Sequence, residues 1–273
     1  MAKIQYTFLD LENGESYYGK VYTVNHKGRV NNRVDMSAFN AVPAKGHELH
    51  TLPIGSTINA IFNGAARQFV IVHQGLPSSL YDSSCNGTWL LMKELYEVRR
   101  VWDSTDNDYK NSDIHSYLNG TFYDMFDGSV KEIIKQVKIP YHNGKGDSGS
   151  VLSGTSGLPA KVFLLSGYEV GWTKSTNSAF PEDGACLSYF SGFGTKDSRR
   201  IGYYNGAVMR WWIRSPATNN GYSVRCVYTD GSFDTVNYNS PYGDVGVRPA
   251  LVLPSDARVE IEPNADGSYT LMT

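Results

Sequence analysis

Several residues in this sequence have types and spacings that could support catalysis or metal binding. The segment GDSGS at 146–150 offers Ser148 as a nucleophile of the serine-protease kind, which also needs a His base and an Asp that orients it. Because the segment lies in a Gly/Ser-rich stretch behind an expected helix, we interpret it as a chance match of a short motif. The segment HELH suggests zinc, but His47 and His50 are three residues apart, whereas the helical ligands of H-E-x-x-H are four apart.

Glu169 is the acidic residue with the most distinctive setting, because it directly follows the apolar run AKVFLLSGY. A buried Glu can be an acid with a shifted pKa, but more often it is a structural acceptor, since a buried charge must be paired. We favour the structural role, with Arg214 or Arg248 as the partner. No glycine-rich phosphate loop and no metal-ligand spacing of His, Cys and carboxylates occurs. The sequence therefore predicts no catalytic residue, no metal and no cofactor.

The composition excludes some classes of partner. With 273 residues and 41% hydrophobic residues the chain can bury a sizeable core, and its net charge of -2 gives no reason to expect nucleic acid or an anionic membrane. The three cysteines, Cys85, Cys186 and Cys226, cannot all pair, so we expect reduced, buried thiols. Neither a signal peptide nor an apolar membrane span is expected, which predicts folding in a cytoplasm.

Turn signals divide the chain into short β-prone runs. Residues 1–50, with Asn-Gly and Lys-Gly turns, predict a small N-terminal β segment for attachment or oligomerisation, and a boundary near residue 50 separates it from a larger domain, 51–273. In the larger domain, INAIFNGAARQFVIVHQG predicts two strands joined by a turn at Asn63-Gly64.

Helical spacing of apolar residues predicts two helices. In NSDIHSYLNGTFYDMF, Ser112 or Asp113 is placed to cap the first turn. In DGSVKEIIKQVKI, Ser129 and Glu132 have the spacing of a capping box, and Pro140 ends the helix. Two helices among short strands, followed by long loops, predict an α+β fold.

Residues 215–244 have the composition of a binding surface. Tyr, Asn, Ser, Thr, Asp and Gly fill 21 of these 30 positions. Tyr offers a large contact area at low rotamer cost, and Ser, Asn and Gly supply adaptable hydrogen bonds, as in antibody paratopes. A surface hairpin would need such residues at its tip alone, whereas here they extend along both arms, so the composition favours ligand binding. The three-residue spacing of Val224 and Val227 predicts a bulge in this region.

A series of motifs in a fixed order resembles a known group of proteins. TWLLMKELYE, SDIHSYLNGTF, VFLLSGYEVGW, WWIRSP, DGSF and GVRPALVL resemble a domain family widespread in phages and gut bacteria. The part from WWIRSP to GVRPAL is similar to the variable proteins of diversity-generating retroelements, in which adenine mutagenesis scatters Asn codons to Tyr, Ser, Asp and Thr. The resemblance covers roughly residues 55–255. It implies a C-type-lectin-like fold, akin to formylglycine-generating enzymes, with two helices, short mixed or antiparallel strands and long loops.

The resemblance also assigns residues. It implies a rigid scaffold that includes Trp211, Trp212, Arg214 and Arg248. The region at about 217–244 would be the variable surface, with the ligand-facing residues Asn219, Asn220, Tyr222, Ser223, Arg225, Tyr228, Phe233, Asp234, Asn237, Tyr238, Asn239 and Tyr242. The reactive cysteine motif of formylglycine-generating enzymes does not occur, and EPNA at 262–265, which matches the lectin calcium tripeptide by letters, is better explained as a turn.

We therefore expect a receptor-binding protein without enzyme activity, either tail-associated or diversified by a retroelement. It would reside in a phage tail, or in the cytoplasm before assembly, and its partners would be a host cell-surface protein or glycan and other virion proteins. A homotrimer would raise avidity by about 10²–10⁴. The alternatives are a structural virion protein without receptor duty and an enzyme of the formylglycine-generating kind.

Overall fold

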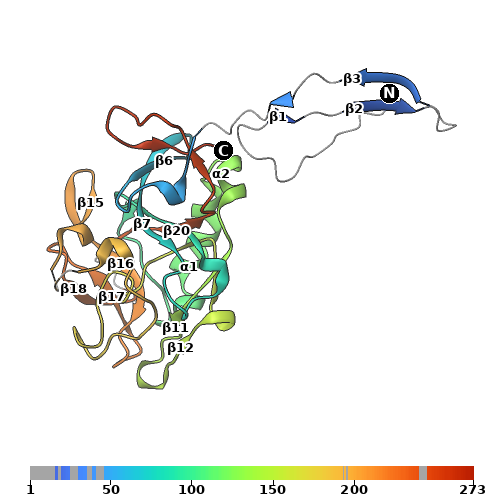
Figure 1. Cartoon of the computed structure of the whole chain (residues 1–273). Helices are drawn as coiled ribbons and strands as arrows, with labels where there is room; N and C mark the ends of the chain where they lie inside the picture. The colour runs from blue at the N-terminus through green and yellow to red at the C-terminus, as the bar shows by residue number, and fades with distance from the viewer. Residues whose placement is uncertain are drawn as a thin grey trace. The chain divides into compact units, whose positions relative to one another are not determined.

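The computed structural model describes residues 16–17, 20–24, 30–35, 39–40, 46–192, 194, 196–239 and 245–273. The chain divides into two compact units, Met1–Gly46 and His47–Thr273 (Figure 1). In the first unit β1 (Ser16–Tyr17) pairs with β4 (Phe39–Asn40), and β2 (Lys20–Val24) pairs with β3 (Val30–Asp35). The second unit begins at His47 because β5 (His47–Glu48) pairs with β21 (Arg258–Val259) near the end of the chain.

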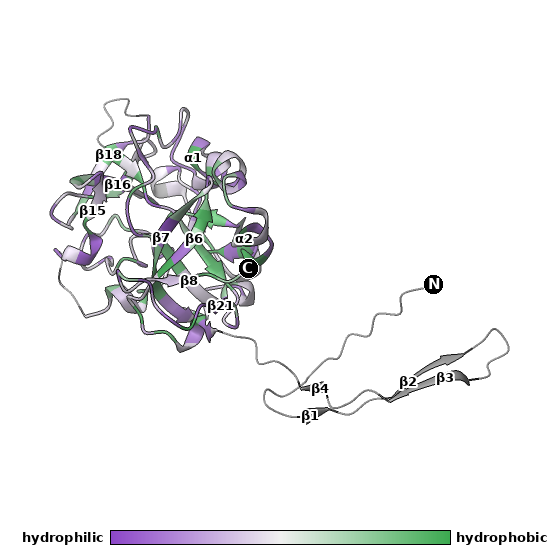
Figure 2. Ribbon diagram, turned by 90° about the horizontal axis from the view of Figure 1, so that it is seen from above, coloured by the Kyte–Doolittle hydropathy of each residue, from purple (hydrophilic) through white to green (hydrophobic). Residues whose placement is uncertain are grey.

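Two six-stranded sheets form the framework of the second unit. Sheet I has the order β14 (Val162–Phe163), β20 (Ala250–Leu253), β8 (Gly87–Met92), β7 (Ala65–Gly75), β6 (Thr57–Phe62) and β22 (Tyr269–Thr270). Every residue of β8 and β20 is buried, which agrees with their continuous apolar runs. Figure 2 shows apolar segments along β6, β7 and β8 and more hydrophilic loops around them.

The turn between β6 and β7 confirms the predicted hairpin. Asn63 and Gly64 both have positive φ, 51° and 71°, as a two-residue type I′ turn requires. The strands on either side pair in regular antiparallel register from Phe62 with Ala65 to Thr57 with Val70.

Sheet II carries the Tyr-rich region. Its strands follow the order β18 (Phe233–Asn237), β17 (Ser223–Val227), β16 (Ala207–Pro216), β19 (Val245–Val247) and β9 (Glu97–Val98), and β15 (Gly202–Tyr204) pairs with β16. The bulge predicted from Val224 and Val227 is not on their own strand, since β17 pairs with β18 without interruption. The register shift between β16 and β17 instead lies on β16, between Trp212 and Pro216. In both ribbon views the strands β16 and β18 and the helix α2 (Gly128–Ile133) lie on opposite sides of the unit (Figure 1, Figure 2).

The helices are shorter than the sequence predicts. The α-helix α1 (Asp113–Tyr117), capped by Ser112, continues as the π-helical segment η4 (Leu118–Phe122). The second helix, α2, ends at Ile133, and the residues that were expected to complete it form the strand β10 (Val137–Ile139). Its N-terminus is capped by Asp127, whose carboxylate accepts from Ser129 N at 3.1 Å, so the predicted capping box is wrong. None of the helices in the described ranges is long and apolar enough to cross a membrane.

The remaining elements are short. Two further pairs are antiparallel: β10 with β13 (Leu158–Ala160), and β11 (Tyr141–His142) with β12 (Val151–Leu152). Single 3₁₀ turns occur at Leu49–Thr51, Ser83–Cys85, Tyr109–Asn111, Gly146–Ser148, Gly154–Ser156, Ser188–Phe190 and Ser198–Arg200.

The predicted α+β class with a C-type-lectin-like fold is wrong, because the chain is mostly β. Strands account for 34% of the structure and helices for 17%, with one helical stretch of 10 residues and several sheets. Helical periodicity was present over residues 111–139, but strand pairing of Val137–Ile139 with Leu158–Ala160 overrode it in the second half.

The core is built around tryptophan. All five Trp side chains of the protein are fully buried. Buried indole N–H groups need partners inside the protein, and for four of the five a backbone carbonyl is the partner: for example, Trp89 donates to Cys85 O at 3.0 Å, and Trp212 donates to Arg100 O at 2.8 Å. These bonds fix both the depth and the orientation of the rings.

Candidate ligand-binding site

The Tyr-rich region is not one continuous surface, because β17 is an inner strand of sheet II. It lies between β16 and β18, and all five of its residues are buried. Exposed residues of the region lie at the two ends of the β17–β18 hairpin and at Thr235 on the edge strand β18. Tyr222 precedes β17 at one end, and Tyr228 follows it at the other.

Two residues that were expected to face a ligand are inside the protein. Ser223 is buried, and Arg225 is 4% exposed. The Arg225 guanidinium lies 4.9 Å from the ring centre of Phe180 and 5.5 Å from that of Phe233, and it donates to Thr235 Oγ1. Assigning Ser223 and Arg225 to the exposed surface was wrong, and Phe180, Phe233 and Thr235 are the residues that cover the Arg225 side chain.

Residues at the Tyr222 end form a surface that we call the Asn/Tyr rim. It consists of Asn219, Asn220, Tyr222, Asn237, Tyr238 and Asn239. Tyr222 is 60% exposed, and Asn219, Asn237 and Asn239 are also exposed. Asn220 and Tyr238 are half-buried. The rim is contiguous because Ser223 pairs with Asn237, and Tyr238 N donates to Tyr222 O at 3.2 Å.

Asn107 fixes the backbone of the rim, and sequence reasoning missed it. Its side chain is fully buried, and its amide donates to Asn220 O at 3.1 Å and to Ser223 O at 3.0 Å. Its Oδ1 accepts from Lys145 N at 3.1 Å, which ties the 143–150 loop to the rim. No sequence signal marks this residue, since its role depends on two segments far away along the chain.

The Tyr228 end is a separate surface. Tyr228 is 40% exposed, with the Arg210 guanidinium 5.5 Å from its ring centre. Asp234 is half-buried and pairs with Arg210 at 3.0 Å. Phe233 is half-buried and packs edge-on against Phe180 at 5.2 Å. Tyr242, the last predicted contact residue, lies outside the described residues.

A buried ion pair joins several segments of the second unit, and it confirms the expected structural role of Glu169. Arg214 and Glu169 are both fully buried and form a two-bond pair with N–O distances of 2.6 Å. Arg214 also donates to Pro140 O, Leu164 O and Asp183 O, at 2.9, 2.8 and 3.0 Å. Arg214, rather than Arg248, is the partner.

The other predicted scaffold residues are also buried. Trp211 donates its indole N–H to Arg200 O at 2.7 Å. The guanidinium of Arg248 lies 5.2 Å from the centre of the Trp211 ring and donates to Met92 O and Lys93 O at 2.9 and 3.1 Å. Arg248 thereby connects β8 of sheet I with sheet II.

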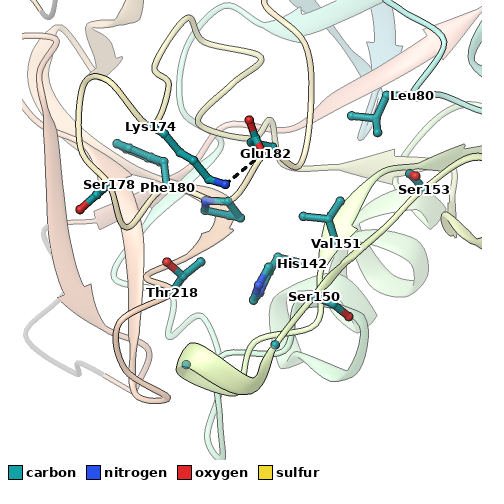
Figure 3. Close-up of a pocket in the computed structure, with 13 residues that line it drawn as sticks. Leu80, His142, Ser150, Val151, Ser153, Lys174, Ser178, Phe180, Glu182 and Thr218 are labelled. Carbon is teal, nitrogen blue, oxygen red and sulfur yellow. Dashed lines mark hydrogen bonds and ion pairs between the residues drawn. The ribbon is translucent and has the colours of Figure 1, made fainter.

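A polar pocket of about 610 Å³ adjoins the rim. Thr218 and Gly146 line it, and Gly146 lies against Asn220 of the rim. On one side are His142 of β11 and Ser150, and on another are Lys174 and Glu182, which form an exposed ion pair at 3.0 Å (Figure 3). We take the pocket and the adjoining rim together as the candidate site.

The GDSGS segment forms a turn at the edge of the pocket. Ser148 Oγ donates to Lys145 O at 2.8 Å within a 3₁₀ turn, an arrangement that serves the turn. A side chain at position 149 would collide with Gly144 O and the His142 ring, so glycine is required there. In the part of the chain that the structure describes, no group of three or more His, Cys, Asp or Glu residues could hold a metal ion. Cys85 and Cys226 are buried thiols as expected, but Cys186 is exposed.

Asp183 is fully buried behind the pocket and should make stability depend on pH. Burial raises its pKa to about 7, against the opposing effects of the Arg214 charge and the Ser215 hydrogen bond. Because the folded pKa lies above the ordinary value of 3.8, the protonated form is favoured by folding. Its contribution to stability is present below about pH 4 and is lost as the pH rises through 7.

We expect Asp183→Asn to remove this dependence. Between pH 5 and 8, the Tm of the unmodified protein should fall relative to that of the variant, measured by circular dichroism at each pH. The comparison cancels titrations common to both proteins. A constant difference in Tm over this range would show that Asp183 does not titrate there.

Comparison with protein families matches residues 86–255 to a domain of unknown function, DUF6273. The chain belongs to the DUF6273 family. Neither the curated proteins nor the solved structures include a significant match. The DUF6273 region includes sheet II, the rim, the Glu169–Arg214 pair and the polar pocket except Leu80, and it omits β6, β7 and β22 of sheet I.

Proposed function

We propose that this DUF6273 protein is a recognition protein that binds a ligand on the surface of a host cell through the Asn/Tyr rim and the adjoining polar pocket. In a phage tail, its other partners would be virion proteins. The proposal assigns the protein no enzymatic step.

The observation that carries this proposal is the contrast between the rim and the strand beneath it. Tyr222 is 60% exposed, whereas the next five residues along the chain, Ser223–Val227, are all buried. A large aromatic side chain that contributes little to packing, surrounded by exposed Asn residues on a rigid sheet, suits a contact surface. Asn107 holds the rim backbone at Asn220 O and Ser223 O, so less conformational entropy would be lost on binding.

The test is cell binding by the full chain. Fluorescently labelled protein, measured by flow cytometry against a panel of gut bacterial strains, should bind a subset of them. We expect Tyr222→Ala with Asn237→Ala to weaken that binding by about 10-fold or more, as loss of an aromatic hot spot does. The Tm of the variant should stay within about 2 °C, since exposed side chains contribute little to stability.

Tyr203→Ala is the matched control. Tyr203 is 42% exposed on β15, which pairs with the Ala207–Met209 end of β16, whereas the rim follows the other end at Pro216. An equal loss of binding in both variants would contradict the rim as the contact surface. Absence of binding to any strain would favour a structural role in the virion.

A further inference from the structure

Three hydroxyl groups around the polar pocket are not needed for the hydrogen bonds that hold the fold together. In the described part of the chain, the hydroxyls of Ser150, Ser178 and Thr218 have no hydrogen-bond partner, although all three residues line the pocket. Elsewhere such hydroxyls complete turns: Ser112 accepts from His115 N, and Ser148 donates to Lys145 O. Ser150 and Ser178 are exposed and Thr218 is half-buried, so water bonds to these hydroxyls and a ligand at the mouth of the pocket can replace it.

His142 supplies a hydrogen-bond donor in the same pocket. The residue is 5% exposed, and its Nδ1 accepts from Gly144 N at 3.1 Å. Burial lowers the pKa of His142, so the ring is neutral near pH 7. With Nδ1 accepting, the proton lies on Nε2, and this N–H has no partner among the residues that the structure describes. Nε2 is not one of the buried side-chain atoms left without a partner in the described residues, so this N–H opens to the pocket, where water or a ligand can accept from it.

The charges of the pocket restrict what that ligand can be. Lys174 and Glu182 are the two charged residues among its lining, and they pair with each other. An anionic ligand would meet the Glu182 carboxylate, and a cationic one would meet the Lys174 ammonium. A neutral ligand with several hydroxyls can instead accept from Lys174 and donate to Glu182 at once, and charge-assisted hydrogen bonds of this kind are the strong ones.

The pocket also has an apolar side. Leu80 and Val151 line it opposite the ion pair, as Figure 3 shows. A sugar ring has both kinds of surface, because its hydroxyls lie around an apolar C–H face. The volume of about 610 Å³ falls within the range of small-ligand sites.

We propose that the polar pocket binds a neutral terminal sugar of a cell-surface glycan. This inference rests on the proposed recognition function and names its ligand class. His142 Nε2 and the pocket hydroxyls contact the terminal sugar, and the next sugar units pass over Thr218 and Asn219 to the exposed ring of Tyr222. The rim thus extends the pocket instead of forming a second, independent site.

The experiment uses the full chain and defined glycans. The protein is screened on an array of neutral oligosaccharides that end in galactose, glucose, mannose or N-acetylglucosamine, together with sialylated counterparts. Kd for a bound oligosaccharide is then measured by calorimetry. We expect binding to a subset of the neutral glycans. Ser178→Trp, which fills the pocket from an exposed position, should raise Kd by about 10-fold or more, whereas Ser175→Trp, on the same loop but outside the pocket, should not.

The outcomes separate this inference from the proposed function. Binding of sialylated glycans alone, binding of no glycan, or equal Kd values for Ser178→Trp and Ser175→Trp would overturn the sugar pocket. If cell binding is then still lost in the Tyr222 variant, the recognition function stands with another ligand. If neither the Tyr222 variant nor Ser178→Trp changes cell binding, both fail.

Discussion

Arg214→Met is expected to lower the free energy of unfolding by about 3–5 kcal/mol or more, enough to leave little folded protein. The substitution leaves the Glu169 carboxylate, which is fully buried, without its cation, and an uncompensated buried charge costs about this much. It also removes the guanidinium group that donates to Pro140 O through Nε and to Asp183 O through Nη2. The effect is measured by urea denaturation followed by tryptophan fluorescence.

A second pair of variants tests whether the charge is the cause. Glu169→Gln with Arg214→Met removes both charges, and it should recover part of the stability lost in Arg214→Met, because replacing a whole buried pair costs less than breaking it. Lys174→Met breaks the exposed Lys174–Glu182 pair and should change stability by less than about 1 kcal/mol. If Arg214→Met and Lys174→Met lowered the free energy of unfolding by similar amounts, the role assigned to the buried Glu169–Arg214 pair would be contradicted.

The role of Arg214 extends to the candidate site. Pro140 directly precedes β11, which contributes His142 to the pocket, and Asp183 directly follows Glu182 on another side of it. By donating to both carbonyls, Arg214 holds these two sides at a fixed separation. The buried pair is therefore what makes the pocket preformed, and a preformed site loses less entropy on binding.

Trp212→Ala is expected to destabilise the protein by about 3–5 kcal/mol, whereas Tyr222→Ala should change stability by less than about 0.5 kcal/mol. Trp212 is fully buried in β16, and its removal leaves a large cavity and an unpaired Arg100 carbonyl. Tyr222 is 60% exposed. Denaturant unfolding of the two variants under the same conditions measures both effects.

Tyr238→Ala should lower the free energy of unfolding by an amount between those for Trp212→Ala and Tyr222→Ala. Its ring packs against the core, and its hydroxyl donates to Thr105 O at 2.7 Å, so part of the cost of a buried aromatic applies. Equal stability losses for Trp212→Ala and Tyr222→Ala would mean that framework and contact surface have been assigned wrongly.

Local features could be predicted from the sequence because they depend on neighbouring residues. Asn63-Gly64 adopts the left-handed turn that its residue types favour, and Ser112 caps α1 with the side chain expected of a cap. The pairing of Glu169 with an Arg also followed from local evidence, since an acid behind an apolar strand must find a cation. Those inferences needed no knowledge of the remaining fold.

The predictions that failed concern relations between distant segments. Arg225 has the residue type of a surface contact, but Phe180, Phe233 and Thr235 surround its guanidinium in the folded chain. The helical spacing after Asp127 was real, yet Val137–Ile139 pairs with Leu158–Ala160 as a strand. Periodicity describes which side of a segment is apolar, and it does not determine which partner covers that side.

The amino-acid sequence alone determined the local turns, the first helix cap, the need for a buried ion pair at Glu169, and the polar and aromatic composition of the rim. The tertiary structure alone decided that β17 is an inner strand, that His142 and Thr218 line one pocket, and that Asn107 joins this pocket to the rim. The physical reason is the range of the interactions involved. Caps and turns form between residues a few positions apart, whereas burial and pocket geometry arise from contacts between segments separated by tens of residues.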